Sequence, residues 1–346
     1  MKFWKKKQFW GVILGIVALG FCLKEIRLQD VETLFQRINL LWVIPSAAAA
    51  YFFIIVRGLR WRILISKQSR ITVTRSVCLY SAGQVLNIVM PALTGQVGRL
   101  ILFARKQSLR KTFVFSTIIM EIVFDAASLI IFMFLTSLAF VFPNQYRFFG
   151  FIVAAITVAV LVLLYMMLNF QTRLEEFARK CFRERSPGLY ITFKKFIRSF
   201  TKGTELLKSS QHMFAIIGFS LVSWVGHVLA IYFLFLSFGF KLSVATAAVV
   251  MIINTIILMV PITPGNSGTF ELAVSLSLAA FSVGRTDAVM FALALHLLDL
   301  LPIFTLGMAF FWHEKVSLRE FKDEHEDEDI FDKISEEGTY IEEEQV

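Results

Sequence analysis

The sequence predicts an all-α polytopic membrane protein with about six full spans and two re-entrant broken-helix pairs, arranged as an inverted repeat. Of its 346 residues, 57% are hydrophobic, which is more than a water-soluble domain can cover with polar surface. Apolar runs long enough to cross a bilayer recur along the chain. The pattern Pro-x-x-x-Gly-x-x-Gly also occurs twice, once starting at Pro91 and once at Pro261. Helix breakers at matching points of two membrane halves are typical of transporters.

The N-terminal quarter predicts two helices. The first is expected over about Gln8 to Leu23, behind lysines that imitate a signal peptide but without a small-residue cleavage site. The second is expected over about Leu40 to Val56. A strongly basic loop is expected next, and its cationic residues are Arg57, Arg60, Arg62, Lys67, Arg70 and Arg75.

The first broken segment is expected over about Ser76 to Ala104, and the third and fourth helices over about Thr112 to Phe142 and Phe148 to Phe170. Each arm of a broken segment holds only about 11 to 18 apolar residues, which favours half-helices. The alternative is that each broken segment makes two full crossings.

The C-terminal half repeats this order after a polar insertion. Residues 171–211 form a basic segment, expected as amphipathic helices on the cytoplasmic membrane surface. A fifth helix is expected over about His212 to Phe238, the second broken segment over Ser243 to Val283, and a sixth helix over Asp287 to Trp312. Residues 313–346 are expected to be an acidic, disordered cytoplasmic tail.

The distribution of basic residues predicts the orientation of these elements. The positive-inside rule places the N-terminal lysines, both loops beside the first broken segment, and residues 171–211 in the cytoplasm. The first broken segment must then enter from the cytoplasm and return to it, and the second must do so from outside. Repeat A, residues 40–142, and repeat B, residues 212–312, are therefore expected to be inverted. The protein is expected in the plasma or inner cell membrane, with both of its termini in the cytoplasm.

The breaks themselves are candidate binding sites. Proline removes an N–H donor, and glycine allows a turn with positive φ. The second arm of each pair then begins with an exposed helix N-terminus near mid-membrane, which favours an anion such as a phospholipid phosphate. Candidate caps are Thr94 in the first pair and Ser267 or Thr269 in the second. The alternative is that the breaks are packing kinks.

Ionisable residues inside membrane segments usually mark function. Glu121 and Asp125 share a helix face, as do His296 and Asp299. Arg99 is expected either to hold a phosphate or to pair with Glu121. These residues are expected to line a polar cavity, the alternative being satisfied interhelical pairs, and His227 is expected to be a packing histidine. The candidate substrate-binding residues are Asn87, Thr94, Gly95, Gly98, Arg99, Glu121, Asp125, Asn254, Gly265, Ser267, Gly268, Glu271, His296 and Asp299, with Pro91, Pro261 and Pro264 as structural breakers.

Several classes of partner are not expected. The net charge of +9 lies in short loops that face anionic lipid, and no nucleic-acid-binding module is visible. The spacing of the three cysteines fits neither a metal site nor a disulfide framework. No nucleotide-binding loop is present in the sequence, so neither a cofactor nor direct use of ATP is expected.

Five stretches carry a resemblance to a known family: Arg57-Gly-Leu-Arg-Trp-Arg62, Asn87-x-x-x-Pro91, Gly95-x-x-Gly98-Arg99, Glu121-x-x-x-Asp125 and Pro261-x-x-Pro264-Gly265-x-x-Gly268-x-Phe270-Glu271. Together they resemble the lysylphosphatidylglycerol synthase transmembrane family, the flippase-like domain of a bifunctional synthetase and flippase. The likeness covers about Leu40 to Trp312. It implies a flippase-like domain over residues 1–312 that moves phospholipids or lipid-linked molecules between leaflets, with membrane lipids carrying anionic headgroups as its partners.

The family's full-length synthases add a soluble aminoacyl-transferase domain, and the tail here is too short for one. The resemblance therefore implies translocation without enzymatic lipid aminoacylation. The chain departs from the family pattern at Gln96, where glutamate is frequent, at Asn266-Ser267, and around His296, where an arginine is frequent.

Three other interpretations share parts of this evidence. A proton-coupled transporter of a small solute would use the same fold with a closed polar cavity. An intramembrane enzyme, either a protease or a lipid-modifying transferase, would use Ser267 with His296, or a carboxylate, as nucleophile and base. A non-transporting membrane partner would dock through residues 171–211.

Overall fold

The computed structural model describes residues 38–90, 94–138, 209–258 and 263–314, with isolated positions elsewhere, and within these it is helical without strands. Four of the described helices are long and apolar enough to span a membrane: α3 (Leu40–Ile65), α6 (Lys111–Ser137), α10 (Ser210–Ser237) and α13 (Arg285–Glu314). They correspond to four of the six predicted spans. The predicted helices at 8–23 and 148–170, the basic segment before residue 209 and the tail after residue 314 lie outside the described residues, isolated positions aside.

Two pairs of shorter helices lie between the long ones, at both predicted breaks. They are α4 (Val73–Val89) with α5 (Thr94–Lys106), and α11 (Val244–Leu258) with α12 (Thr269–Ala279), the latter preceded by the 3-10 turn η3 (Pro264–Asn266). We call them hairpin A and hairpin B. Each half of the chain therefore runs as a long helix, a hairpin and a second long helix. The starts of α3 and α10 are separated by the same sequence offset as the two Pro-Gly motifs.

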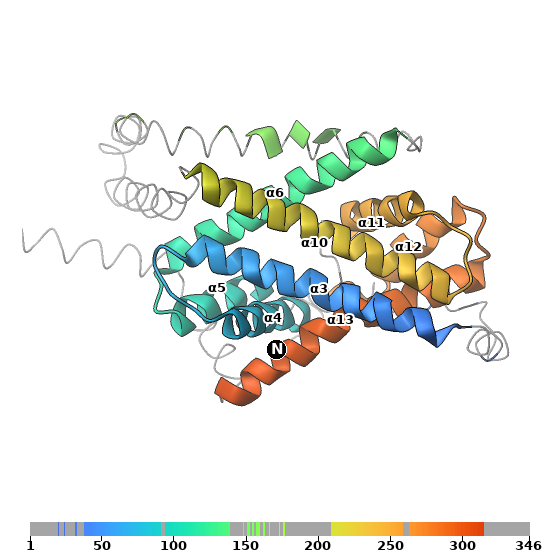
Figure 1. Cartoon of the computed structure of the whole chain (residues 1–346), viewed down its shortest axis with the longest axis horizontal. Helices are drawn as coiled ribbons and strands as arrows, with labels where there is room; N and C mark the ends of the chain where they lie inside the picture. Colours follow the sequence, from blue (N-terminus) through green and yellow to red (C-terminus); the bar gives the residue numbers. More distant parts are fainter. Residues whose placement is uncertain are drawn as a thin grey trace, which may run out of the picture.

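The helices α3 and α10 pack side by side and antiparallel (Figure 1). The amide of Asn39 donates to the carbonyl of Ser237 at 2.9 Å, which joins the start of α3 to the end of α10. Toward the other end, Arg60 Nη1 donates to Ser220 Oγ at 2.8 Å. Because these two helices are equivalent in the repeat, their opposite directions are those that an inverted repeat predicts.

The hairpins open toward opposite ends of the molecule. Glu314, at the end of α13, accepts from Arg75 at 3.0 Å and from Lys106 at 3.1 Å. The open end of hairpin A therefore lies beside the ends of α3 and α13, and we call this end of the molecule the basic end. Hairpin B follows the end of α10 and precedes the start of α13, at the opposite end. The two tips meet: α4 packs against η3, and a methyl group added to Gly265 would lie 3.3 Å from the side chain of Ile88.

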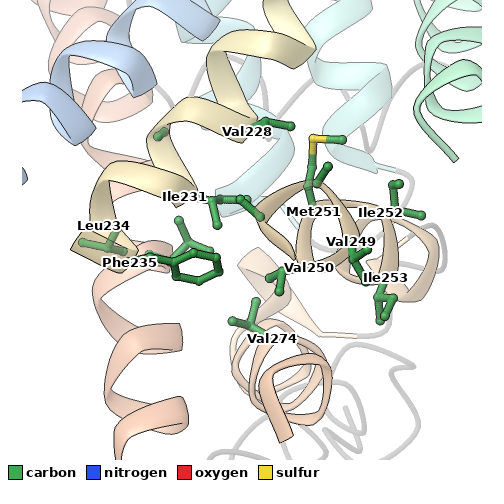
Figure 2. Packing of buried hydrophobic residues seen from close by; sticks show 14 of the residues in the cluster. Val228, Ile231, Leu234, Phe235, Val249, Val250, Met251, Ile252, Ile253 and Val274 are labelled. Carbon is green, nitrogen blue, oxygen red and sulfur yellow. The ribbon is translucent and has the colours of Figure 1, made fainter. Parts of the chain in front are cut away.

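The described residues form two apolar cores, and each contains helices from both halves. In one of them, α11 is apolar apart from Thr246, Asn254 and Thr255, and it is enclosed by α10, α12 and α6. Figure 2 shows Val249 to Ile253 of α11 among Ile231 and Phe235 of α10 and Val274 of α12. The other core joins the ends of α3 and α13 to hairpin A and the start of α6.

The structure corrects two local predictions. The helix expected to end at Val56 continues to Ile65, so Arg57, Arg60 and Arg62 belong to α3 and not to a loop. Gly265 and Gly268 have φ of +58° and +83°, as predicted, but Gly95 and Gly98 lie inside α5 without positive φ.

Candidate functional site

A group of five charged residues, three buried and two half-buried, lies where the first half meets α10, and we call it the arginine cluster. Its members are Arg57 and Arg60 on α3, Arg99 on α5, and Glu121 and Asp125 on α6. Arg60 connects the two carboxylates, with Nη1 at 2.6 Å from Asp125 Oδ1 and Nη2 at 3.4 Å from Glu121 Oε1. Arg99 also pairs with Glu121, and Arg57 with Asp125. The predicted alternative in which Arg99 pairs with Glu121 is the one that the structure contains.

Aromatic rings cover the outer guanidinium groups of the cluster. Arg99 lies 4.9 Å from the ring centre of Tyr80 and 5.0 Å from that of Phe103. Arg57 lies 4.8 Å from Phe53 and 5.9 Å from Trp224. A guanidinium is weakly hydrated and is attracted to ring faces, so these contacts help to keep the arginines inside an apolar protein.

The charges of the arginine cluster do not balance. Three arginines, which stay protonated, face two carboxylates, and this leaves a surplus of one positive charge among the described residues. The Nε atoms of all three arginines are buried without a hydrogen-bond partner in the described part of the chain. A buried surplus charge is unfavourable in a low-dielectric environment unless an anion balances it.

A second polar group, the histidine site, lies at the break of hairpin B. His296 on α13 bonds Glu271 Oε1 through Nδ1 at 2.7 Å and the carbonyl oxygen of Gly265 through Nε2 at 3.1 Å. Glu271 Oε2 accepts from the amide of Gly268 at 2.6 Å. Phe270 stacks on the imidazole at 4.4 Å between ring centres. Glu271 therefore caps α12 while it holds His296.

The cap of α12 differs from the one that we predicted. Gly268, and neither Ser267 nor Thr269, is the residue before the helix, because its positive φ suits the sharp turn there. The hydroxyl of Thr269 instead donates back to the carbonyl of Asn266 at 2.9 Å. In the first hairpin, α5 begins at Thr94.

His227 packs against aromatic rings, as predicted, but it also has an acidic partner that was not predicted. Its Nε2 lies 3.3 Å from Asp299 Oδ2, and its ring stacks on Phe53 at 4.8 Å. His227 is the repeat equivalent of Arg57, because the sequence offset between them is the one that separates Pro91 from Pro261. Each contacts Phe53, and each pairs with an aspartate on the last long helix of its own half. The repeat register points to His227 but not to its partner, because the equivalent of Asp125 is Leu295 and Asp299 lies about one helical turn later.

The remaining predicted residues fall into different surroundings. Gly95 lies so close to α4 that a methyl group there would meet Asn87 Cα at 2.6 Å, and one on Gly98 would meet the sulfur of Met90 at 2.8 Å. These glycines allow the arms of hairpin A to approach closely. Asn254 is buried in α11, and its Oδ1 has no partner among the described residues. Pro264 begins η3, while Pro91 and Pro261 lie outside the described residues.

With this geometry established, comparison with known proteins gives the family. The sequence model of the lysylphosphatidylglycerol synthase TM region matches residues 8–307. The chain belongs to this family. The match confirms the resemblance carried by the motifs and includes every member of the arginine cluster and of the histidine site. A UPF0104 membrane protein of Pyrococcus horikoshii is 21% identical over 305 residues, which cover 82% of this chain and 90% of that protein. No solved structure matches the chain at a significant level.

Proposed function

We propose that this protein is a flippase-like transporter of the cell membrane, without enzymatic activity, that moves phospholipids or lipid-linked molecules between leaflets. The observation that carries the proposal is the meeting of two inverted hairpins, tip to tip, at Ile88 and Gly265. Irregular backbone at membrane depth occurs where it is enclosed by protein or lines a polar path. Both halves also carry buried ionisable residues: Arg60, Arg99 and Glu121 in the first, and Glu271 and His296 in the second.

The hairpins are proposed to be re-entrant. At 1.5 Å per residue, the 17 residues of α4 extend about 26 Å and the 11 residues of α12 about 17 Å, and a hydrocarbon core is roughly 30 Å thick. Neither pair is therefore long enough for two complete crossings. The basic end, where α3, α5 and α13 terminate, is assigned to the cytoplasm, and the chain termini are assigned there too.

The ligand is proposed to carry an anionic headgroup that is drawn to the surplus charge of the arginine cluster. Arg60 and Arg99 are almost fully buried in ion pairs, whereas the side chain of Arg57 is 19% exposed. We therefore assign the first phosphate contact to Arg57 and give Arg99 a supporting role beside Glu121. The other predicted site residues would line a path from the arginine cluster, past the hairpin tips, to the histidine site. The acyl chains of the lipid would stay in the bilayer.

The geometry around Ser267 supports a transporter more than an intramembrane hydrolase. Ser267 is exposed, and both ring nitrogens of His296 are occupied by Glu271 and Gly265. A serine nucleophile needs a base within hydrogen-bond reach. We therefore expect Ser267→Ala to move lipid as fast as wild type.

The proposed function is tested by reconstitution into liposomes that contain a fluorescent anionic phospholipid, followed by a leaflet-accessibility assay with and without an imposed pH gradient. Wild type is compared with Arg57→Gln. The control is Arg62→Gln, which removes an exposed arginine less than two turns further along the same helix. We expect wild type and Arg62→Gln to move the lipid, and Arg57→Gln to be slowed at least tenfold. Normal movement by Arg57→Gln would remove the assigned contact, and no movement by wild type in either condition would contradict the function.

A further inference from the structure

The two hydrogen bonds of His296 require one more proton than its neutral ring carries. Nδ1 faces a carboxylate oxygen of Glu271 and Nε2 faces the carbonyl oxygen of Gly265, and both oxygens are acceptors. A neutral imidazole has one N–H group, whereas an imidazolium has two. Turning the ring over would put carbon atoms against both oxygens, so the two bonds also fix its orientation. Both bonds exist together only when an extra proton is held, on the ring or on the carboxyl group of Glu271.

This extra proton sits where the two halves of the protein meet. Gly265 belongs to the turn whose neighbour is Ile88 of hairpin A, and the second oxygen of Glu271 holds the amide of Gly268. Glu271 and His296 are 3% and 8% exposed. Loss of the proton would leave an uncompensated negative charge in this buried position and would break one of the two bonds. It would therefore release α13 from one side of the break.

We propose that Glu271 and His296 form a proton-binding site that fastens the tip of hairpin B to α13, so that a proton is the coupling ion for movement of this hairpin. The coupling to transport rests on the proposed function, whereas proton binding by the pair does not. On the packed helices, Asp299 on α13 pairs with His227 on α10, and Arg57 on α3 shares Phe53 with His227. Arg285 and Asp287 lie at the start of α13, and His313 and Glu314 lie at its end, where Glu314 pairs with Arg75 of α4. His212 lies at the start of α10, and Arg60 and Arg62 lie near the end of α3. Because Asp299 already pairs with His227, Glu271 is the acidic partner left to His296.

Glu271→Gln is the informative variant because it preserves the geometry without the proton. The amide oxygen can accept from Gly268, its NH₂ group can donate to Nδ1 of His296, and the ring can then donate from Nε2 to Gly265. Every bond of the site is retained, so the variant should fold. Asp287→Asn, in the first turn of the same helix α13, is the matched control for loss of a carboxylate.

Proton binding is measured by NMR of full-length protein with ¹⁵N-labelled histidine. The signals of His296 among the five histidines are identified by their absence in His296→Gln. We expect the ring nitrogens of His296 to shift with pH in wild type and in Asp287→Asn, and to stay in the Nε2–H form in Glu271→Gln. Signals of wild-type His296 that do not move while the protein stays folded would overturn the proposal, as would a Glu271→Gln variant that titrates like wild type.

Coupling is measured in the liposome assay as the ratio of lipid movement with and without a pH gradient. We expect the ratio to differ from one in wild type and in Asp287→Asn, and to become one in Glu271→Gln, whatever the absolute rate. A Glu271→Gln variant that keeps the wild-type ratio would overturn the coupling. If wild type moves no lipid at all, the proposed function fails, and the NMR titration still decides whether the pair binds a proton.

Discussion

Removing a carboxylate from the arginine cluster should destabilise the protein more than removing an arginine. The cluster holds three arginines and two carboxylates. Glu121→Gln raises its surplus positive charge from one to two, and it leaves Arg99 without its carboxylate. Arg99→Met lowers the surplus to zero, and Glu121 keeps Arg60 at 3.4 Å. The two variants remove opposite ends of the same ion pair, so the difference between them reports the charge balance of the cluster.

The magnitudes follow from burial. Arg60 is 0% exposed and Arg99 only 4%, so Glu121→Gln deprives buried cations of their partner, which typically costs about 3–5 kcal/mol. Arg99→Met mainly loses the contacts with the rings of Tyr80 and Phe103, and these are worth about 1–2 kcal/mol. The expected difference in the free energy of unfolding is about 2 kcal/mol, which is roughly a 30-fold change in the unfolding equilibrium.

The assay is equilibrium unfolding in mixed micelles with increasing SDS, followed by tryptophan fluorescence, with Asp287→Asn as control. The double variant Arg99→Met with Glu121→Gln completes a thermodynamic cycle, and it should be less destabilised than the sum of the single variants because the two side chains contact each other. If Arg99→Met destabilises the protein as much as Glu121→Gln, the argument from surplus charge is refuted.

Three further outcomes are expected. Gly95→Ala should lower stability by about 1–3 kcal/mol because the new methyl group meets the backbone of Asn87, whereas Gly218→Ala, with nothing within 4 Å, should be neutral or slightly stabilising; SDS unfolding of both checks this. Gly265→Ala should cost about 1–2 kcal/mol because its φ is +58°, and equal stability to wild type would contradict that backbone assignment. Glu314→Gln should cost less than about 1 kcal/mol, and this cost should shrink in high salt, since its ion pairs with basic residues are partly exposed.

Among the described residues, the sequence was sufficient for the order of the helices because that order depends on local signals. The two Pro-Gly motifs interrupt apolar runs, and the helices stop and restart there in both halves. The helix α3 was predicted to end at Val56, which is nine residues too early, because a local signal was misread. Charged residues were assigned to a loop, yet an arginine is a good helix former, and Arg57 and Arg60 continue the helix because partners on α6 neutralise them.

The contents of the candidate site were harder to predict because its partners are distant in sequence. Glu121 and Asp125 were expected to share a helix face, but which cations reach them depends on how α3 and α5 pack against α6. The pairing of His227 with Asp299 likewise requires α10 and α13 to meet. The capping role of Gly268 depends on a turn whose geometry the sequence pattern alone does not specify.

The two halves share an architecture but differ in the chemistry at equivalent points. Arg57 and His227 occupy equivalent positions of the repeat, contact the same phenylalanine and pair with aspartates, yet a guanidinium is always charged whereas an imidazole has a neutral and a charged form. The first half therefore carries a fixed positive surplus, which suits an anionic ligand, while the second half carries both of the buried histidine–carboxylate pairs among the described residues. If the halves move against each other, as inverted repeats do, the ligand would act on one side of the contact and the proton on the other.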